Sequence, residues 1–543
     1  MGAGGGTARR RRGTAAGLVG AALLVASTVL TPGGAYAQPS PPPGGHSAGP
    51  GEDEGHDGQG DRDGRKGDHG KGGAKPPAGP SPSATTGAAT ATRRAAPPAG
   101  SSSAPATGGD PSAARPAPAP AVVLAAAGPE AAVPTAPGLQ QALAAALADR
   151  NLGDVGLAVA DAADGRLLYG SAENTAATPA STTKLATSIA ALSLIPGDTR
   201  LTTRVVRGAE PGTITLVGGG DPTLTALPAD QVQIGGQPVD ADTAPASLDE
   251  LARQTAAALT AAGTGTVRLD YDLSLYSGNP QHKNHDAQNI ALVVPLMVDE
   301  AKADPKSRED APARVADPAG AAAEAFAAAL KLRGITVEGR AKPAVVPAAA
   351  DAPVLGRVAS PTVDRLVERL LTTSDNQLAE AIARQAALAA HQPAGFEGAV
   401  TAVTQELTRL GVPMANVTLN DGSGLNPNNA IPPAVLVRLL SLAASEQHPA
   451  LRPVLTGLPV AGFTGTLGKR YGSGSGAADA AGLIRAKTGT LSAVNTLAGT
   501  VVDADGRLLA FAVMTRTPAT ASVDATRAAM DRVAAHLAAC GCH

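Results

Sequence analysis

The sequence predicts an α+β fold in which an antiparallel sheet is covered by helices. Strand candidates at 496–502 and 508–514 are joined by a short Asp-Gly turn, and a helical pattern at 523–537 follows them. A second pair of short strands, 155–160 and 166–169, flanks a polar turn early in the folded part. This order of helices and hairpins favours an antiparallel sheet over a doubly wound one.

The composition excludes several classes of protein. The chain has 543 residues, with 44 Lys and Arg against 47 Asp and Glu, which leaves no broad basic field for nucleic acid. Five Tyr, four Phe and no Trp are too few for stacking on single strands. Cys540 and Cys542 are the only cysteines, which excludes a disulfide framework and a cysteine-based zinc module. They can close a small ring, to which we attach no function.

Residues 1–37 are typical of an export signal. Arginines at 9–12 precede an apolar run at 17–30, and Ala35-Tyr36-Ala37 offers a small-residue cleavage site before Gln38. The alternative is an uncleaved anchor, but the apolar run is short for a membrane span. No later stretch is apolar enough to span a bilayer, so we expect a protein of the extracytoplasmic cell-wall space with no transmembrane segment after cleavage.

Residues 38–135 are predicted to form a disordered, low-complexity linker. From Gln38 to Pro120 there is no Val, Ile, Leu, Met, Phe, Tyr or Trp, so this stretch cannot bury enough apolar surface to offset its ordering entropy. The linker is either a tether for the folded part or simple filler, and the sequence does not separate the two.

Folding signals begin near Pro137, where 139–147 has a helical pattern. Short strands and Gly/Pro turns dominate 201–360, and 363–371 is a cleanly amphipathic helix. Further elements are predicted as helices at 181–192, 248–262, 319–332 and 377–384, and as a strand at 483–486.

Ser181 and Lys184 form the first candidate catalytic pair. They stand three residues apart at a helix start, so their side chains share one face. A serine hydroxyl becomes a nucleophile when a neighbour takes its proton, and a lysine can do this if burial lowers its pKa. Taken alone, Ser-x-x-Lys is a weak motif that a capping serine and a surface lysine also explain.

Ser374-Asp375-Asn376 lies in a predicted turn between two helices. The serine hydroxyl can relay protons, and the asparagine amide can hold both a substrate carbonyl and Lys184. The alternative is a simple N-cap for the following helix, which all three residue types favour.

Lys487-Thr488-Gly489-Thr490 follows an edge-like strand at 483–486. Its lysine and hydroxyl groups can hold a carboxylate, its glycine allows close approach of a substrate backbone, and the N–H of Thr490 can donate to an oxyanion. An ordinary strand end with a turn is the alternative.

These three motifs occur in one order in one exported chain, and this set resembles that of penicillin-binding proteins and serine β-lactamases. Longer strings resemble the low-molecular-weight class C penicillin-binding proteins, the D-alanyl-D-alanine carboxypeptidases and endopeptidases. The alanine-rich, tryptophan-free composition suggests an actinobacterial member. The resemblance covers about 137–537, and its strings lie at 218–224, 421–425, 457–467 and 486–491.

The resemblance implies a penicillin-recognising domain, formed by 136–200 and 361–543, that is split by an inserted domain region at 201–360. It implies acyl transfer to water on peptidoglycan stem peptides, and acylation by β-lactams, without a cofactor or metal. The residues would be Ser181 as nucleophile, Lys184 as general base, and Ser374 and Asn376 as the second wall of the active site. Lys487 and Thr488 would hold the substrate carboxylate beside Gly489, and the N–H groups of Ser181 and Thr490 would form the oxyanion hole.

One departure concerns substrate recognition. The family usually continues Asp-Gly-Ser-Gly-Leu with Ser-Arg, whereas this chain has Asn426-Pro427, so a positive charge is missing. Asp272 resembles the acidic residue that meets the free amine of the peptide. The stem-peptide preference and the balance of carboxypeptidase and endopeptidase activity therefore stay open, as does the oligomeric state.

Two alternative functions remain. A class A β-lactamase also carries Ser-Asp-Asn and Lys-Thr-Gly, but no Glu-x-x-Leu-Asn segment is present to supply a deacylating carboxylate. A non-catalytic wall-binding or penicillin-sensing protein would need neither Lys184 nor oxyanion donors. His282 and His285 have metal-like spacing, but they lie in a polar stretch that we expect to be a solvated loop.

Overall fold

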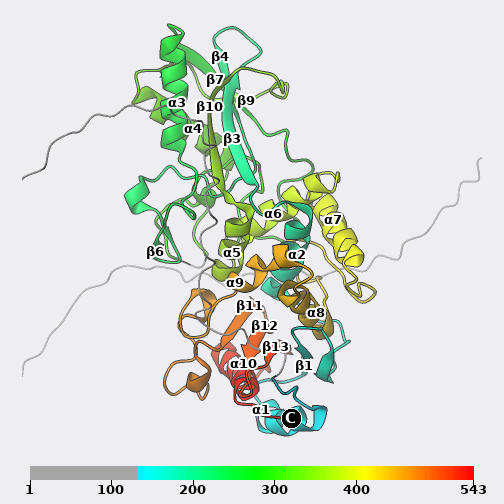
Figure 1. Ribbon diagram of the computed structural model, residues 1–543. Helices are drawn as coiled ribbons and strands as arrows, with labels where there is room; N and C mark the ends of the chain where they lie inside the picture. Colours follow the sequence, from blue (N-terminus) through cyan, green and yellow to red (C-terminus); the bar gives the residue numbers. More distant parts are fainter. Residues whose placement is uncertain (1–130, 310) are drawn as a thin grey trace, which may run out of the picture. The chain divides into compact units, whose positions relative to one another are not determined.

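The computed structural model describes residues 131–309 and 311–543 (Figure 1). The predicted export signal and most of the predicted linker lie outside these residues. The last five linker residues, 131–135, are described, and the Thr135 side chain accepts a hydrogen bond from Gly138 N (3.2 Å) as the N-cap of helix α1, Ala136–Leu147.

A five-stranded antiparallel sheet forms the centre of the predicted catalytic part, in the order β11-β12-β13-β1-β2. The first and last segments of the folded chain thus meet in one sheet, because β1 pairs with β13 along its whole length. The antiparallel sheet that the sequence predicts is confirmed. Its strands are β1 (Val155–Asp161), β2 (Leu167–Ser171), β11 (Ile484–Leu491), β12 (Val494–Val502) and β13 (Leu508–Arg516).

Alternation along the strands gives this sheet two buried faces. Leu157 and Val159 of β1 point to a core shared with α1 and α10, whereas Ala158 and Ala160 point to a core shared with the other helices. Because alanine is small, the helices on the side of Ala158 and Ala160 can pack close to the sheet. These helices are α2 (Thr183–Leu194), α5 (Val363–Thr373), α6 (Asn376–Ala389), α7 (Phe396–Arg409), α8 (Pro433–Ala444) and α9 (Pro453–Thr456), and α10 spans Val523–Ala538.

A second sheet with the order β10-β3-β4-β7-β8, and with β9 also paired to β7, lies between α2 and α5 in the sequence. It is mixed, because β4, β8 and β9 each run parallel to β7. The helices α3 (Leu248–Ala261) and α4 (Pro318–Lys331) bury an apolar core against it. Its strands are β3 (Arg200–Arg207), β4 (Thr213–Val217), β7 (Thr266–Asp272), β8 (Thr336–Val337), β9 (Lys342–Pro343) and β10 (Val354–Thr362), with a separate ribbon of β5 (Gln233–Ile234) and β6 (Gln237–Pro238).

The long segment 273–317 leaves this second sheet and packs against the helices of the catalytic part. Ile290 and Val293 share an apolar cluster with Phe396 of α7, and Ala291 N donates to the Gln377 side chain of α6 (3.0 Å). This segment contains a single-turn 3₁₀ helix, Asp299–Ala301. This part of the predicted inserted region therefore reaches the neighbourhood of Ser374–Asn376.

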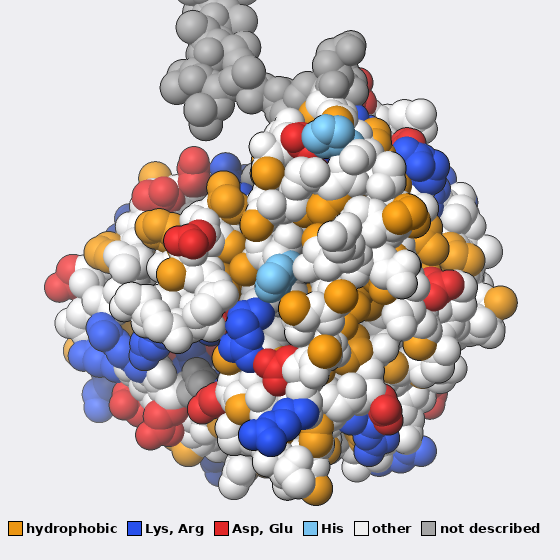
Figure 2. Space-filling view, turned by 90° about the horizontal axis from the view of Figure 1, so that it is seen from below, with side chains coloured by type: hydrophobic (Ala, Val, Ile, Leu, Met, Phe, Trp, Pro, Cys, Tyr) orange, Lys and Arg blue, Asp and Glu red, His pale blue; other side chains and the backbone are white. Residues whose placement is uncertain are grey.

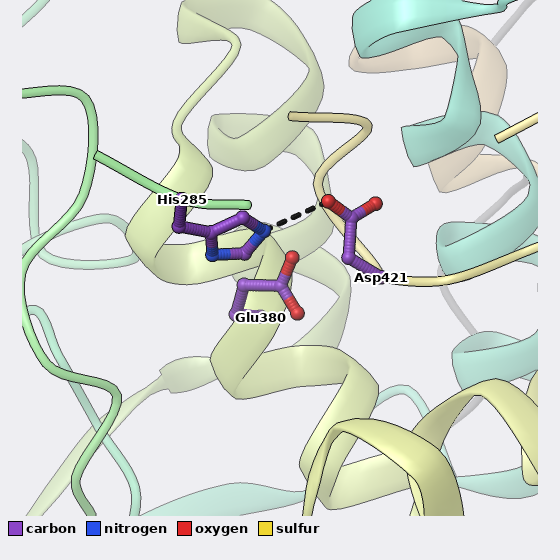
Figure 3. A group of neighbouring side chains, drawn as sticks. All are labelled: His285, Glu380 and Asp421. Atoms are coloured by element: carbon purple, nitrogen blue, oxygen red, sulfur yellow. Dashed lines mark hydrogen bonds and ion pairs between the residues drawn. The ribbon is translucent and has the colours of Figure 1, made fainter. Parts of the chain in front are cut away.

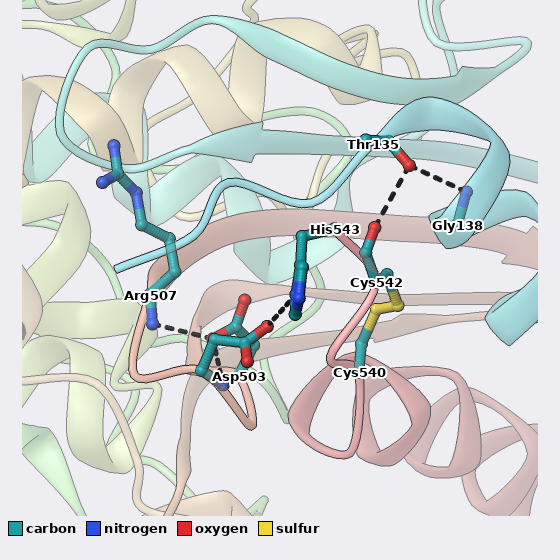
Figure 4. Close-up of a disulfide and its surroundings, with 8 residues drawn as sticks. Thr135, Gly138, Asp503, Arg507, Cys540, Cys542 and His543 are labelled. Atoms are coloured by element: carbon teal, nitrogen blue, oxygen red, sulfur yellow. Dashed lines mark hydrogen bonds and ion pairs between the residues drawn. A yellow bond between two sulfur atoms is a disulfide. The ribbon is translucent and has the colours of Figure 1, made fainter. Parts of the chain in front are cut away.

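Figure 4 shows the C-terminal tail, which contacts the start of the folded chain and the turn between β12 and β13. Cys540 and Cys542 form a disulfide, and the carbonyl of Cys542 accepts hydrogen bonds from Thr135 N (2.9 Å) and Thr135 Oγ1 (3.1 Å). The His543 ring contacts the Asp505 carboxylate in the turn between β12 and β13 (3.0 Å). The tail thus ties the start of the folded chain to its last hairpin.

Two predictions about local structure are wrong. Lys487–Thr490 do not follow a strand but lie within β11, which is an edge of its sheet and extends to Leu491. His285 does not lie in a solvated loop, since its side chain is 1% exposed. Helices α7 and α8 were not anticipated from the sequence.

Charges on the surface are mixed in sign. On the face drawn in Figure 2, Lys and Arg side chains alternate with Asp and Glu, and the described part of that face shows no broad basic area. Among the described residues, no helix has the length and apolar character needed to cross a membrane.

Candidate active site

Ser181 and Lys184 meet at the N-terminal end of α2. Ser181 lies in a 3₁₀ turn, Ala180–Thr182, that runs directly into the helix. Lys184 is fully buried, and its Nζ atom lies 2.9 Å from Ser181 Oγ, 2.7 Å from Asn376 Oδ1 and 2.7 Å from the carbonyl oxygen of Ser423. Three oxygens therefore fix the amine beside the hydroxyl that it could deprotonate.

Burial lowers the pKa of Lys184 to about 8, although the carboxylates of Asp421, Glu380 and Asp375 act in the opposite direction. Roughly one molecule in ten then holds a neutral Lys184 at pH 7. A neutral amine at hydrogen-bonding distance from a serine hydroxyl can accept its proton.

Lys487 connects the Lys-Thr-Gly motif to the Ser-Asp-Asn motif. Its Nζ donates to Ser374 Oγ (2.8 Å) and to the carbonyl of Thr488 (2.7 Å), and its side chain is fully buried. Burial and the nearby charge of Lys184 hold the pKa of Lys487 well below its usual value. Ser374 ends α5 in the left-handed conformation (φ 59°), which turns its hydroxyl toward β11.

Gly489 lets β11 lie directly against the turn that carries Ser181. A Cβ atom on Gly489 would collide with Thr496 Oγ1 and would lie 2.8 Å from the Pro179 carbonyl oxygen and 3.0 Å from Ser181 N. Thr496 Oγ1 itself donates to the Pro179 carbonyl (2.8 Å). This close contact brings the edge strand that carries Thr490 beside the N–H of Ser181.

The Asp421–Gly424 turn provides the carbonyl that holds Lys184. Glu380 of α6 accepts hydrogen bonds from Ser423 N (2.7 Å) and Gly422 N (3.1 Å). Asp421 Oδ1 accepts a hydrogen bond from Gly424 N (2.9 Å). Two buried carboxylates thus fix the backbone of this turn.

His285 completes this buried group, and Figure 3 shows its Nε2 directed at Asp421 (2.8 Å), with Glu380 alongside. Ligand atoms of the three residues lie within 4.8 Å of one another, which is suitable spacing for a cation. Their oxygens, however, already accept hydrogen bonds from N–H groups, including Asn426 N (2.6 Å) and Ser423 N (2.7 Å). A cation would have to displace these donors, so the arrangement favours a hydrogen-bonded network over a metal site.

His285 is buried because residues far away in the sequence cover it. Its ring packs edge-on against Phe396 (5.4 Å between centroids) and tilts against His282 (4.8 Å). The polar sequence around it gave no sign of these partners.

Thr488 and Asp272, the remaining predicted substrate-binding residues, have different surroundings. Thr488 Oγ1 donates to Thr466 Oγ1 (2.8 Å), so a second hydroxyl lies beside the predicted carboxylate site. Asp272 instead accepts hydrogen bonds from Ser274 N (2.8 Å) and Ala348 N (2.7 Å). Within the described chain, none of its hydrogen bonds goes to a residue of the three predicted motifs.

The position of the missing arginine is used for packing. Asn426 Oδ1 accepts a hydrogen bond from Asn284 (3.0 Å), and the Pro427 carbonyl accepts one from Thr178 (3.3 Å). A different arginine, Arg527 of α10, donates to Thr490 Oγ1 (3.2 Å).

Four residues of the site were not predicted from the sequence: Glu380, Ser423, Thr466 and Arg527. The strings around Ser423 and Thr466 were noted but received no chemical role. Ser423 acts through its carbonyl, which every residue type has, so no side-chain pattern could have identified it.

The fold and these contacts together define a serine acyl-enzyme of the penicillin-recognising class. The chain belongs to the D-Ala-D-Ala carboxypeptidase 3 (S13) family, whose family model matches residues 139–312 and 303–537.

Relatives agree with this assignment. The chain is 36% identical over 422 residues to carboxypeptidase DacB of Mycolicibacterium smegmatis, covering 76% of this chain and 86% of the relative. It is 34% identical over 422 residues to a carboxypeptidase of Mycobacterium tuberculosis, again covering 76% of this chain and 86% of the relative. Among solved structures, penicillin binding protein 4 of Haemophilus influenzae is similar in fold, with a TM-score of 0.58 and 19% identity over 74% of this chain and 98% of that one.

Proposed function

We propose that this chain is a serine D-alanyl-D-alanine carboxypeptidase of peptidoglycan stem peptides, with Ser181 as nucleophile and Lys184 as general base. The observation that carries this proposal is the 2.9 Å contact between Ser181 Oγ and a fully buried lysine amine. Burial lowers the pKa of that amine to about 8, so a neutral, proton-accepting form is accessible near physiological pH.

Acylation begins when Ser181 Oγ attacks the carbonyl carbon between the two D-alanines and its proton passes to Lys184. The resulting oxyanion accepts hydrogen bonds from the N–H groups of Ser181 and Thr490. The C–N bond then breaks, the leaving amine takes the proton that Lys184 accepted, relayed by the Ser374 hydroxyl, and D-alanine departs. Water hydrolyses the ester and returns the proton to Ser181.

Substrate binding is assigned to the edge strand. Lys487 and Thr488 would hold the terminal carboxylate, with Thr466 as an added hydroxyl, because carboxylates prefer such charged and hydroxyl donors. The Asn376 amide, which also contacts the Asn289 carbonyl (3.3 Å), would hold the acyl carbonyl of the peptide. Asp272 stays a prediction for the free amine of the peptide.

An extracytoplasmic location fits this function, since peptidoglycan lies outside the cytoplasm. The Cys540–Cys542 disulfide supports it, because such bonds persist in oxidising compartments. β-Lactams would acylate Ser181 by the same attack and leave slowly.

Intact mass tests the proposal. The protein from Gln38 onward is incubated with benzylpenicillin beside a Ser181→Ala control, and release of D-alanine from a D-alanyl-D-alanine peptide is followed in parallel. A persistent stoichiometric adduct that the control lacks, together with D-alanine release, supports the proposal. Rapid destruction of the antibiotic without an adduct indicates a β-lactamase. An absence of both adduct and turnover indicates a non-catalytic wall-binding protein.

A further inference from the structure

A group of charged side chains joins the inserted region to the second motif. The carboxylate of Glu300, which is 5% exposed, pairs with Arg369 of α5 and with Lys302 Nζ (2.9 Å). It also makes a side-chain hydrogen bond with the carboxyl group of Asp375, the middle residue of Ser-Asp-Asn. Asp221 is 2% exposed, and the charges of both Glu300 and Arg369 act on its pKa, which burial raises.

The backbone around Glu300 is held in an unfavourable conformation. Asp299, Glu300 and Ala301 all have positive φ (51°, 57° and 58°), although none of them is glycine. Such a run persists only where its surroundings impose it. Here Glu300 N donates to the Pro222 carbonyl (3.0 Å), and its own carbonyl accepts from Arg314 (2.7 Å). The strained turn directs the Glu300 carboxylate at α5 and Asp375.

Asp375 occupies the centre of the active-site turn. Its Oδ1 accepts a hydrogen bond from Leu378 N (2.9 Å) and so caps α6. On one side of it, Ser374 Oγ accepts a hydrogen bond from one active-site lysine (2.8 Å), and on the other side Asn376 Oδ1 accepts one from the second lysine (2.7 Å). A displacement of Asp375 would therefore move both partners of the two lysines.

We propose that Glu300 is a positioning residue for the acyl-enzyme chemistry: it holds the Ser374–Asn376 turn through a proton that its carboxylate shares with Asp375. The inference rests on the proposed function, since it concerns the residues assigned to that reaction. Two carboxyl groups can form a hydrogen bond with each other only when one of them carries a proton.

The charges around the pair place that proton on Asp375. Burial raises the pKa of Asp375 to about 6, and the carboxylate of Glu300 acts in the same direction. The pKa of Glu300 is lowered, because the cations of Arg369 and Lys302 outweigh the effect of its burial. The shared proton is thus present at pH 5 and lost as the pH rises through about 6. Ionised Asp375 also raises the pKa of Lys184, so both consequences reduce the rise in acylation rate that deprotonation of Lys184 gives as the pH increases.

Two variants test this inference by the rate of acylation with benzylpenicillin between pH 5 and pH 8. Asp375→Asn replaces the shared proton with an amide N–H that does not titrate, while its carbonyl can still cap α6. Glu300→Ala removes both the hydrogen bond to Asp375 and the charge that pairs with Arg369. Glu368→Ala is the matched control, because Glu368 also lies on an ion-paired surface of α5 but contacts Arg365 and Thr456 instead.

We expect the ratio of the Asp375→Asn rate to the wild-type rate to rise severalfold as the pH passes through about 6, and to be level below pH 5.5. Glu300→Ala should slow acylation on the order of tenfold at pH 5.5, with Glu368→Ala within twofold of wild type. A pH-independent ratio, or equal rates for the two alanine variants, overturns the inference. A wild-type protein that benzylpenicillin does not acylate contradicts the proposed function instead. Thermal unfolding of each variant identifies loss of fold.

Discussion

Gly489 offers a direct test of whether the edge strand β11 and the turn of Ser181 form one catalytic unit. Gly489→Ala adds a single methyl group on the inward face of β11. That methyl group would collide with Thr496 Oγ1 and would lie 2.8 Å from the Pro179 carbonyl oxygen and 3.0 Å from Ser181 N, where 3.4–4 Å is ordinary contact. The strand or the turn must therefore separate by about half an ångström.

The size of the effect follows from this displacement. Misplacing catalytic groups by about 1 Å can cost on the order of 100-fold in rate, so half of that displacement should slow acylation roughly tenfold or more. Overpacking of this kind costs about 1–3 kcal/mol of stability, which lowers the melting temperature without unfolding the protein. The acylation rate should fall while the protein stays folded.

The assay is the rate of penicilloyl-enzyme formation by intact mass, with the melting temperature measured on the same samples. Gly472→Ala is the control, because a Cβ atom there meets no atom within 4 Å. An acylation rate for Gly489→Ala within twofold of the Gly472→Ala rate would refute the close contact between β11 and Ser181.

Three further predictions concern the base, its support and the carboxylate site. The rate of acylation should rise with pH toward about 8, the pKa to which burial lowers Lys184. Lys184→Ala should reduce the acylation rate by about 1,000-fold or more. A flat pH profile, measured by stopped-flow mixing, contradicts the role of Lys184 as general base. Glu380→Gln should slow acylation about tenfold, because the Ser423 turn loses a charged acceptor, and an unchanged rate would remove Glu380 from the support of the base. Thr466→Val should raise KM for a D-alanyl-D-alanine peptide roughly 3–10-fold with kcat nearly unchanged if its hydroxyl, beside Thr488, binds the carboxylate.

The parts of the site that depend on nearby residues could be predicted from the sequence. Ser181 and Lys184 are three residues apart on a helix start, so their contact follows from helical geometry alone. The contact of Lys184 with Asn376 spans 192 residues, and that of Lys487 with Ser374 spans 113. No local pattern specifies such pairings. That Asn376 can hold Lys184 was offered as one interpretation of the Ser-Asp-Asn turn, and the contact between Lys487 and Ser374 was not predicted.

Predictions failed where distant segments decide burial or pairing. His285 sits in a polar stretch that looks solvated, yet Phe396 and Asp421 from the catalytic part enclose it. The strand β11 continues through Lys487 to Leu491 because it pairs residue by residue with β12. Its lysine and threonines gave no strand-like alternation, since Lys487 is buried inside the active site rather than exposed.

The two buried lysines of the site influence each other, and this coupling gives substrate binding a role in activating the base. Nearby carboxylates raise the pKa of Lys184, whereas burial and the charge of Lys184 hold the pKa of Lys487 low. A substrate carboxylate bound at Lys487 favours its protonated form, and that new positive charge lowers the pKa of Lys184 further. The apparent pKa of acylation should therefore lie lower for a peptide with a free C-terminal carboxylate than for the same peptide as its amide. Equal apparent pKa values for the two peptides would show that the lysines titrate independently.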